Sequence, residues 1–210
     1  MNCLILSAAS QLLTPSPEED LQYLGSVPMA DLITSPALRN LTGMVAGTGL
    51  STAPDWLKFK KGSVERYIPR GPISYGMTWN EIHAAGVAYG KEVVINGLTY
   101  TCRLLKGAGQ DPTSGNIGPD EGEFNELFYA VCTSRPADYT GPKLASMSYS
   151  DLRLTVTRGF AVFCQETRDI TSTSRLRRNT TQGNIRTASF ASQTYRHEDS
   201  GWWPVLERQL

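Results

Sequence analysis

The side chains best suited to covalent chemistry are four cysteines and two histidines. A cysteine nucleophile needs a histidine that takes its proton, and Cys164 could in principle meet either His83 or His197. No signature of a cysteine enzyme flanks Cys164. His83 falls on the apolar face of a predicted helix, where a hydrogen-bonded core histidine is the commoner case. We therefore predict no catalytic residue and expect that the chain is not an enzyme.

The same cysteines bear on the redox state of the protein. They are widely spaced and form no CxxC pair, at Cys3, Cys102, Cys132 and Cys164. We expect buried, reduced thiols in a protein made in a cytosol. A disulfide framework is the weaker alternative, because so few cysteines in so long a chain could not be its main support.

A loop and the helix start after it carry a group of acids that could bind a cation. They are Asp111, Asp120, Glu121, Glu123 and Glu126. Calcium needs several oxygen ligands at defined positions, and this loop lacks the EF-hand spacing. Acids at the start of a helix are already explained by the helix dipole. We predict no metal and no cofactor, with calcium at residues 106–126 as the alternative.

Arginines interleaved with serine and threonine form a basic cluster in the second half of the chain. Its members are Arg168, Arg175, Arg177, Arg178, Arg186 and Arg196. Such a cluster could hold phosphates or acidic sugars, but a solvated surface loop is the favoured interpretation. The segment Gly107-Ala108-Gly109 lacks the lysine and the helix context of a phosphate-binding loop.

The overall charge argues against two classes of partner, although it leaves room for a local charged patch. The 210 residues carry 20 basic and 20 acidic side chains, for a net charge of zero. A general nucleic-acid or membrane-surface binder would need a strong basic excess, and no apolar run reaches the length of a membrane span. We expect no nucleic acid and no membrane among the partners.

Two hairpins and two helices are expected in the first part of the body. The alternation in Trp56–Lys60 and Val64–Ile68, with Lys61-Gly62-Ser63 between them, predicts a hairpin. Asn96-Gly97 between Glu92–Ile95 and Leu98–Leu105 predicts a second, because both turn positions need positive φ.

The two helices have their own signals. Thr78-Trp79-Asn80-Glu81 matches a capping box at the start of a helix that Gly90 would end. The second helix runs from Glu123 to Val131, with Phe124, Leu127, Phe128 and Val131 facing inward.

The remainder of the body is predicted to be rich in loops. Residues 106–121 form a loop punctuated by glycine and proline, and residues 165–186 read as a long polar surface loop. Strands are expected at residues 152–156, 160–164 and 188–191.

The last ten residues, 201–210, combine Trp202, Trp203 and Pro204 with Val205-Leu206-Glu207. Two large rings at a chain end must be buried, because aromatic side chains contribute heavily to a core. We expect a short closing strand at residues 205–207 that lies beside the first hairpin.

Residues 1–55 differ in texture, with five prolines and a glycine-rich stretch. We expect an extended or helical N-terminal arm, with a helix start at Ser16-Pro17, which becomes ordered against another chain or against its own domain; a flexible tail is the alternative. The short uncharged start, residues 1–10, is expected to be a structural segment and not a signal peptide. Residues 56–210 are predicted to form an α+β domain.

Several phrases, set side by side, resemble a domain of tailed-bacteriophage virion structural proteins. They occur in this order: Trp56-Leu57-Lys58-Phe59 with Tyr67-Ile68-Pro69, Thr78-Trp79-Asn80-Glu81, Tyr100-Thr101-Cys102-Arg103-Leu104-Leu105-Lys106-Gly107, Glu123-Phe124-Asn125-Glu126-Leu127, Phe163-Cys164-Gln165-Glu166 and Gly201-Trp202-Trp203-Pro204-Val205-Leu206-Glu207. The resemblance covers about residues 56–210. This chain departs from it at Lys106, Phe124, Glu126 and Trp203, where that family has Thr, Trp, Arg and Arg. The layout is also distantly similar to the C-type-lectin-like and formylglycine-generating-enzyme fold.

The resemblance implies a non-enzymatic virion protein of tail, fibre or host-attachment type, made in the host bacterial cytoplasm and forming a homo-oligomer. Its arm would bind other virion proteins, and the loops 106–121 and 165–186 would be exposed. The alternatives are a glycan-binding receptor-recognition module, with loop aromatics such as Tyr139 or Tyr149 in its cleft, or a capsid or neck decoration protein. The least favoured is a formylglycine-type enzyme that would use Cys164 and Cys132. No cysteine pair or calcium ligand of those folds maps onto this chain.

Overall fold

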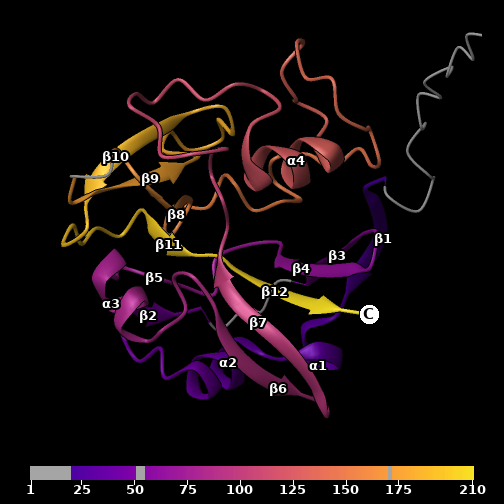
Figure 1. Cartoon of the computed structure of the whole chain (residues 1–210), viewed down its shortest axis with the longest axis vertical. Helices are drawn as coiled ribbons and strands as arrows, with labels where there is room; N and C mark the ends of the chain where they lie inside the picture. The colour runs from indigo at the N-terminus through magenta and orange to yellow at the C-terminus, as the bar shows by residue number, and fades with distance from the viewer. Residues whose placement is uncertain (1–19, 51–54, 170–171) are drawn as a thin grey trace, which may run out of the picture.

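The computed structural model describes residues 20–50, 55–169 and 172–210. In these residues the chain forms a mixed α+β fold of two six-stranded sheets with four short helices (Figure 1). The α+β class predicted from the sequence is confirmed, with strands forming most of the regular structure. None of the described helices is long and apolar enough to span a bilayer.

The first sheet, sheet A, is antiparallel throughout. Its strands in spatial order are β1 (Gln22–Val27), β3 (Trp56–Lys61), β4 (Val64–Pro69), β12 (Pro204–Gln209), β7 (Leu98–Leu104) and β6 (Lys91–Ile95). It has core on both faces, because successive side chains of a strand point to opposite sides. Leu57, Ile68 and Val205 pack on one face with α4 (Gly122–Val131), whereas Tyr67 and Leu206 belong to the core on the other face.

The second sheet, sheet B, combines strands from both halves of the chain. Its spatial order is β10 (Ala188–Ser192), β9 (Ser174–Arg178), β8 (Ala161–Thr167), β11 (Ser200–Trp202), β5 (Ser74–Tyr75) and β2 (Thr48–Gly49). The pair β8–β11 is parallel and the other pairs are antiparallel.

The C-terminal segment runs through the middle of both sheets. β11 lies between β8 and β5, and β12 lies between β4 and β7. Trp202 and Trp203 are fully buried in different core clusters, and the Trp203 indole N–H donates to the Gly159 carbonyl at 2.7 Å. A side chain at Gly201 would collide with that same carbonyl. The predicted closing strand beside the first hairpin is confirmed, and the same segment also supplies a strand to sheet B.

The two predicted hairpins are confirmed. β3 and β4 pair from Trp56 to Pro69 around Gly62-Ser63. β6 and β7 pair around Asn96 and Gly97, whose φ angles are 52° and 79°. These positive angles are what the Asn-Gly turn requires.

The helix after Thr78 is confirmed at its start and is shorter than predicted. α3 (Trp79–Ala84) begins with the full capping box, in which Thr78 and Glu81 bond each other's backbone N–H groups. The helix stops before Gly86, whose φ of 82° is left-handed, so Gly90 does not end it. α4 matches the prediction for 123–131, and its inward residues are fully buried.

The described part of the predicted arm, residues 20–50, packs on the chain's own body. β1 is hydrogen bonded to β3, and β2 to β5. The helices α1 (Met29–Leu32) and α2 (Ser35–Thr42), with the residues that follow them, bury Met29, Leu38 and Met44 in the core cluster that contains Trp56. The expected structural segment 1–10, Cys3 and the helix start at Ser16 lie outside the described residues.

Two expectations for the second half are wrong. Residues 152–155 form turns and none of residues 152–156 is in a strand, although Leu152 and Leu154 are buried. Residues 165–186 are not one surface loop, because they contain the end of β8 and all of β9. The β9 sequence looks solvated because it is rich in arginine, but its Arg177 and Arg178 are buried and hydrogen bonded inside the fold. The strands at 160–164 and 188–191 are confirmed as β8 and β10 within a few residues.

Candidate functional site

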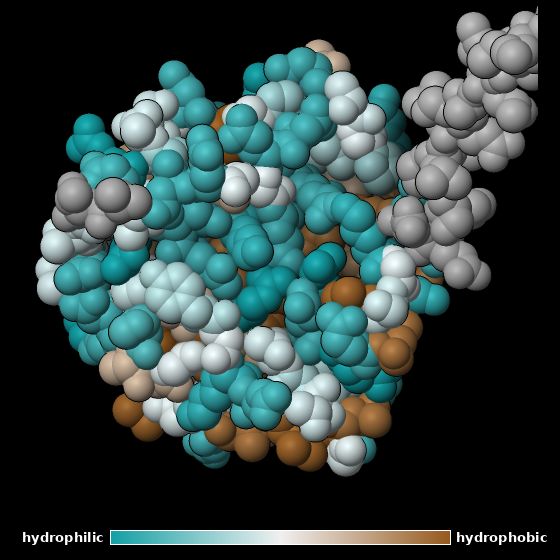
Figure 2. All heavy atoms as spheres, in the orientation of Figure 1, coloured by the Kyte–Doolittle hydropathy of each residue, from teal (hydrophilic) through white to brown (hydrophobic). Residues whose placement is uncertain are grey.

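A polar cleft of about 590 Å³ opens between the start of α4 and sheet A. Three cations and three carboxylates line it: Arg66, Arg103, Lys106, Glu123, Glu126 and Glu207. We call this site the polar cleft. Figure 2 shows hydrophilic residues gathered in the middle of the visible face, between the regions over α4 and over the β6–β7 hairpin.

Sheet register places the charges of the floor beside one another. Glu207 on β12 lies opposite Arg66 on β4 and opposite Thr101 on β7. Arg103 lies opposite Val205, two residues before Glu207, so it is the diagonal neighbour of Glu207 on the same face. Cross-strand and diagonal neighbours of opposite charge are within reach of each other.

Four of these side chains form a closed ion network. Arg103 binds both oxygens of Glu123, at 2.6 and 2.7 Å, and also Glu207 at 2.8 Å. Arg66 lies 2.9 Å from Glu207 and 3.1 Å from Glu123. Burial alone would lower the pKa of Arg103, but the hydrogen bonds and charges of Glu123 and Glu207 outweigh it and raise that pKa. Burial alone has the opposite effect on Glu207 and would raise its pKa. The two arginines outweigh burial and lower that pKa.

The helix is tied to the sheet at the same point. The Glu123 carboxylate, in the first turn of α4, accepts the backbone N–H of Lys106 at 3.2 Å, and Phe124 N–H donates to the Lys106 carbonyl at 2.9 Å. The Gly122 at the start of α4 has a φ of 77° and lies so close to the backbone of residues 107–108 that a side chain would collide with it. Glu123 is therefore held where it meets Arg103.

The side chains at the rim of the cleft form fewer hydrogen bonds and ion pairs than those at its floor. Lys106 is exposed, and no ion pair or side-chain hydrogen bond is formed by its ammonium group within the described residues. Tyr89 is 55% exposed, and Thr101 is half-buried. Gln165 donates through Nε2 to the Leu104 carbonyl at 3.0 Å. This rim offers a cation, an aromatic ring, a hydroxyl and an amide oxygen to a ligand.

Tyr89 is fixed by a cluster outside the cleft. Its ring meets those of Trp79 and His83 edge-on, with centroids 5.8 and 5.9 Å away. His83 stacks on Trp79 at 5.1 Å, and the Arg175 guanidinium lies 3.7 Å from the centre of the Trp79 ring. Arg175 also reaches the Tyr89 hydroxyl at 3.4 Å. The tyrosine is thus both exposed and held.

The candidate nucleophile is not assembled with a base. Cys164 is fully buried, and its thiol donates to the Val162 carbonyl at 3.6 Å. Burial raises the pKa of this thiol well above its ordinary value. His83 and His197 are both exposed, so the expectation of a core histidine at position 83 is wrong. Cys102, Cys132 and Cys164 are buried free thiols as predicted, and Cys3 lies outside the described residues.

The acidic residues of the predicted loop serve separate partners. Asp111 accepts the backbone N–H of Thr167 at 3.0 Å, and Asp120 accepts the N–H and hydroxyl of Thr140. Glu126 binds Lys61 at 2.5 Å, and Glu123 belongs to the ion network. No group of three or more His, Cys, Asp or Glu that could hold a metal occurs in the described parts of the chain.

The basic cluster is dispersed through the fold and does not form one anion site. Arg178, fully buried, donates to the Gly107 carbonyl at 2.8 Å and to Asn125 at 2.7 Å. Arg177 donates to Asp199 and Ser200, and Arg196 binds Glu81 and the Gly76 carbonyl. These arginines join β9 and the C-terminal region to the rest of the molecule.

Two of the loop aromatics expected in a ligand cleft are already engaged. Tyr139 is 7% exposed, and burial raises its pKa to about 12. The Tyr149 hydroxyl donates to the Ser134 carbonyl at 3.1 Å. The aromatic side chain that lines the polar cleft is instead Tyr89.

One buried acid, Glu166 on β8, belongs to the phrase Phe163-Cys164-Gln165-Glu166 but has no role predicted from the sequence. Its carboxylate accepts the Gly107 N–H at 2.8 Å. Burial raises its pKa to about 7, against the opposing effect of backbone hydrogen bonds from Gly107 and Ala108.

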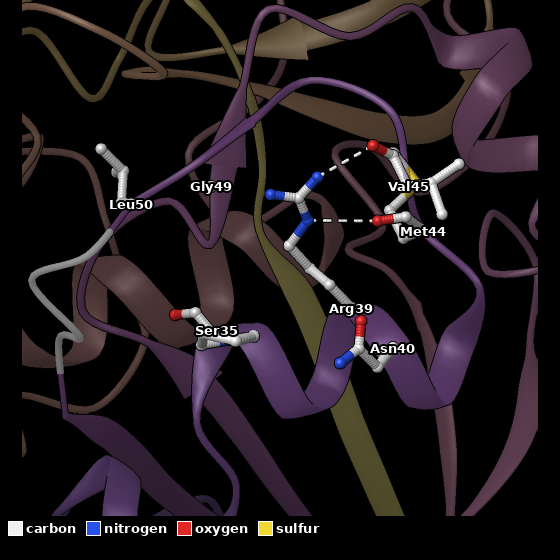
Figure 3. A pocket seen from close by; sticks show the side chains of 8 residues that line it. Ser35, Arg39, Asn40, Met44, Val45, Gly49 and Leu50 are labelled. Carbon is white, nitrogen blue, oxygen red and sulfur yellow. Dashed lines mark hydrogen bonds between the residues drawn. The ribbon is translucent and has the colours of Figure 1, made fainter.

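A second cavity of about 520 Å³ lies beside α2 (Figure 3). Arg39 spans its wall and donates to the backbone carbonyls of residues 44–47 at 3.0–3.1 Å. This arginine thereby shapes the 43–47 turn. Because the polar cleft has an unpaired cation and this cavity's arginine is already bonded, we take the polar cleft as the candidate site.

Sequence reasoning had singled out only Glu123 and Glu126 among the cleft residues, and for a different kind of site. The available signal was the set of ordered phrases, which contain Arg103, Lys106, Glu123, Gln165 and Glu207. Comparisons of the chain with family models, with curated proteins and with solved structures found no match.

Proposed function

We propose that this chain is a bacteriophage virion structural protein, of tail, fibre or host-attachment type. In this proposal residues 1–55 bind neighbouring virion proteins, the chain acts as a homo-oligomer, and the polar cleft faces outward. It is made in the cytoplasm of the host bacterium and becomes part of the particle.

The observation that supports this proposal is the convergence of the ordered phrases. Arg103, Glu123 and Glu207 come from three of them and meet in one ion network. Two further phrases meet elsewhere, where the Trp79 indole N–H donates to the Cys164 carbonyl at 3.0 Å. Residues that resemble one domain in sequence thus lie together as an internal framework.

A C-type-lectin-like layout is part of the same proposal. It is supported by the position of β12 between β4 and β7, since a closing strand near the first hairpin is what that layout implies. A formylglycine-type activity is the least supported alternative, because Cys132 and Cys164 are buried and burial raises the pKa of both thiols. A thiol that stays protonated is a poor nucleophile.

Quantitative mass spectrometry of purified particles tests the proposal. We expect the chain at a fixed number of copies per particle, retained through density-gradient purification and a high-salt wash. Its presence in the infected-cell lysate together with its absence from particles would contradict the proposal. A decoration protein would be distinguished by its release under conditions that leave tails intact.

A further inference from the structure

We infer that the polar cleft binds a carboxylate-bearing saccharide, with the acid group on Lys106 and a sugar ring against Tyr89. This inference rests on the proposed host-attachment function and gives its receptor a chemical class. It does not place the ligand on the arginine cluster or on the loop aromatics considered from the sequence. Of that cluster only Arg175 takes part, by holding Tyr89.

The charge balance of the cleft points to an acidic ligand. Arg66 and Arg103 form ion pairs with Glu123 and Glu207, and these four charges cancel. Glu126 is neutralised by Lys61, which does not line the cleft. Lys106 is then the one lining charge without a partner in the described structure. A ligand carboxylate would complete its pairing, whereas a ligand cation would meet an uncompensated like charge.

The remaining rim groups favour a sugar over a simple acid. Tyr89 presents an exposed ring that is held by Arg175 and the Trp79 stack. A fixed aromatic surface binds a flat, largely C–H face at low entropic cost. The Thr101 hydroxyl donates and accepts, and the Gln165 amide oxygen accepts. Because the Gln165 Nε2 already donates to Leu104, its oxygen has a set orientation.

The size and character of the cleft agree with this ligand class. Its volume of about 590 Å³ lies in the range of small-molecule sites. The ion network below the rim joins Arg103 on β7 to Glu123 at the start of α4. Thr101 lies on β7, and the backbone N–H of Lys106, two residues after β7, donates to Glu123. The backbone that carries these two side chains is therefore held before a ligand binds, and Tyr89 is held by its own cluster, so little affinity is spent on ordering them.

Titration calorimetry with the full chain tests the inference. The probes are trigalacturonate and sialyllactose as two kinds of carboxylate sugar, the methyl ester of trigalacturonate as its neutral counterpart, and inorganic phosphate. We expect binding of at least one carboxylate sugar that weakens as salt is raised. For trigalacturonate, the ester should bind at least 10-fold less tightly. Phosphate binding without sugar binding would overturn the saccharide assignment.

Substitutions locate the binding in the cleft. Lys106→Ala should weaken it about 10- to 100-fold, the loss expected of one charge-assisted contact. Tyr89→Ala should weaken it while Tyr89→Phe retains most of it. Lys143→Ala, at an exposed lysine outside the cleft, is the matched control and should bind normally. Lys106→Ala should melt near the wild-type temperature because its side chain is exposed, and Tyr89→Phe should do so because it keeps the ring contacts with Trp79 and His83. Equal binding by Lys106→Ala and wild type would overturn the inference.

The outcome separates this inference from the proposed function. A chain found in particles that binds none of the carboxylate sugars refutes the saccharide and leaves the virion role. A chain that binds them through Lys106 and is absent from particles refutes the virion role and leaves the site.

Discussion

The buried acid Glu166 should make the protein less stable as the pH rises. Its pKa is about 7 in the folded protein, against an ordinary value of 4.5. Between these values the folded state holds a proton that the unfolded state has released, so the free energy of unfolding falls with pH. Each pH unit between the two pKa values lowers the free energy of unfolding by about 1.4 kcal/mol. The total loss is ~3 kcal/mol and is complete just above pH 7.

Glu166→Gln removes this titration and keeps an oxygen that can accept the Gly107 N–H. Urea unfolding at pH 5 and at pH 8 should show wild type losing up to ~3 kcal/mol across that range through this group, while the variant loses much less. The variant should be more stable than wild type at pH 8. Glu92→Gln, at an exposed acid on β6, is the control and should track wild type. A variant that is less stable than wild type at pH 8, with the same pH slope, would refute the reasoning.

Below pH 4.5 a different set of groups dominates. Glu65, Glu81 and Glu207 are each subject to burial, which raises the pKa, but their cationic or hydrogen-bonding partners outweigh it and lower the pKa below 4.5. The stability that these carboxylates contribute is fully present above their ordinary pKa of 4.5. It is lost as the pH falls through their lowered pKa values. The two windows therefore do not overlap, and the Glu166 effect can be measured alone.

One truncation and two substitutions probe the framework. Truncation after Ser200 removes β12 and most of β11, so it should abolish the cooperative thermal transition; a 1–200 chain that melts at the wild-type temperature would contradict this. Glu123→Gln leaves Arg103 with less compensation, and urea unfolding should show a loss of ~3–5 kcal/mol; a loss below ~1 kcal/mol would mean that the network contributes little. Thr78→Ala removes half of the capping box, and urea unfolding should show a loss of stability of ~1 kcal/mol. An unchanged urea midpoint would mean that the cap does not stabilise the protein.

Local signals predicted most of what was correct. The Asn96-Gly97 turn, the Thr78 cap and the amphipathic α4 each depend on residues a few positions apart. The closing strand was recognised because two tryptophans at positions 202 and 203 had to be buried. What the sequence did not indicate was that the same ten residues cross both sheets.

The errors came from polar residues whose partners are distant in the chain. Arg178 was taken for a loop residue, but its partners Gly107 and Asn125 lie 71 and 53 positions away. The polar cleft was not predicted for the same reason, because Arg66 and Glu207, which bind each other there, are separated by 141 positions. Periodicity carries no information about such pairs.

Cryo-EM of purified particles would show whether this chain is a structural component of the virion. If the chain is the virion protein proposed above, we expect density that fits the two-sheet domain, with neighbouring virion proteins touching residues 1–55 and with Tyr89 and Lys106 facing the outside. Particles of complete composition without density for this chain would contradict it.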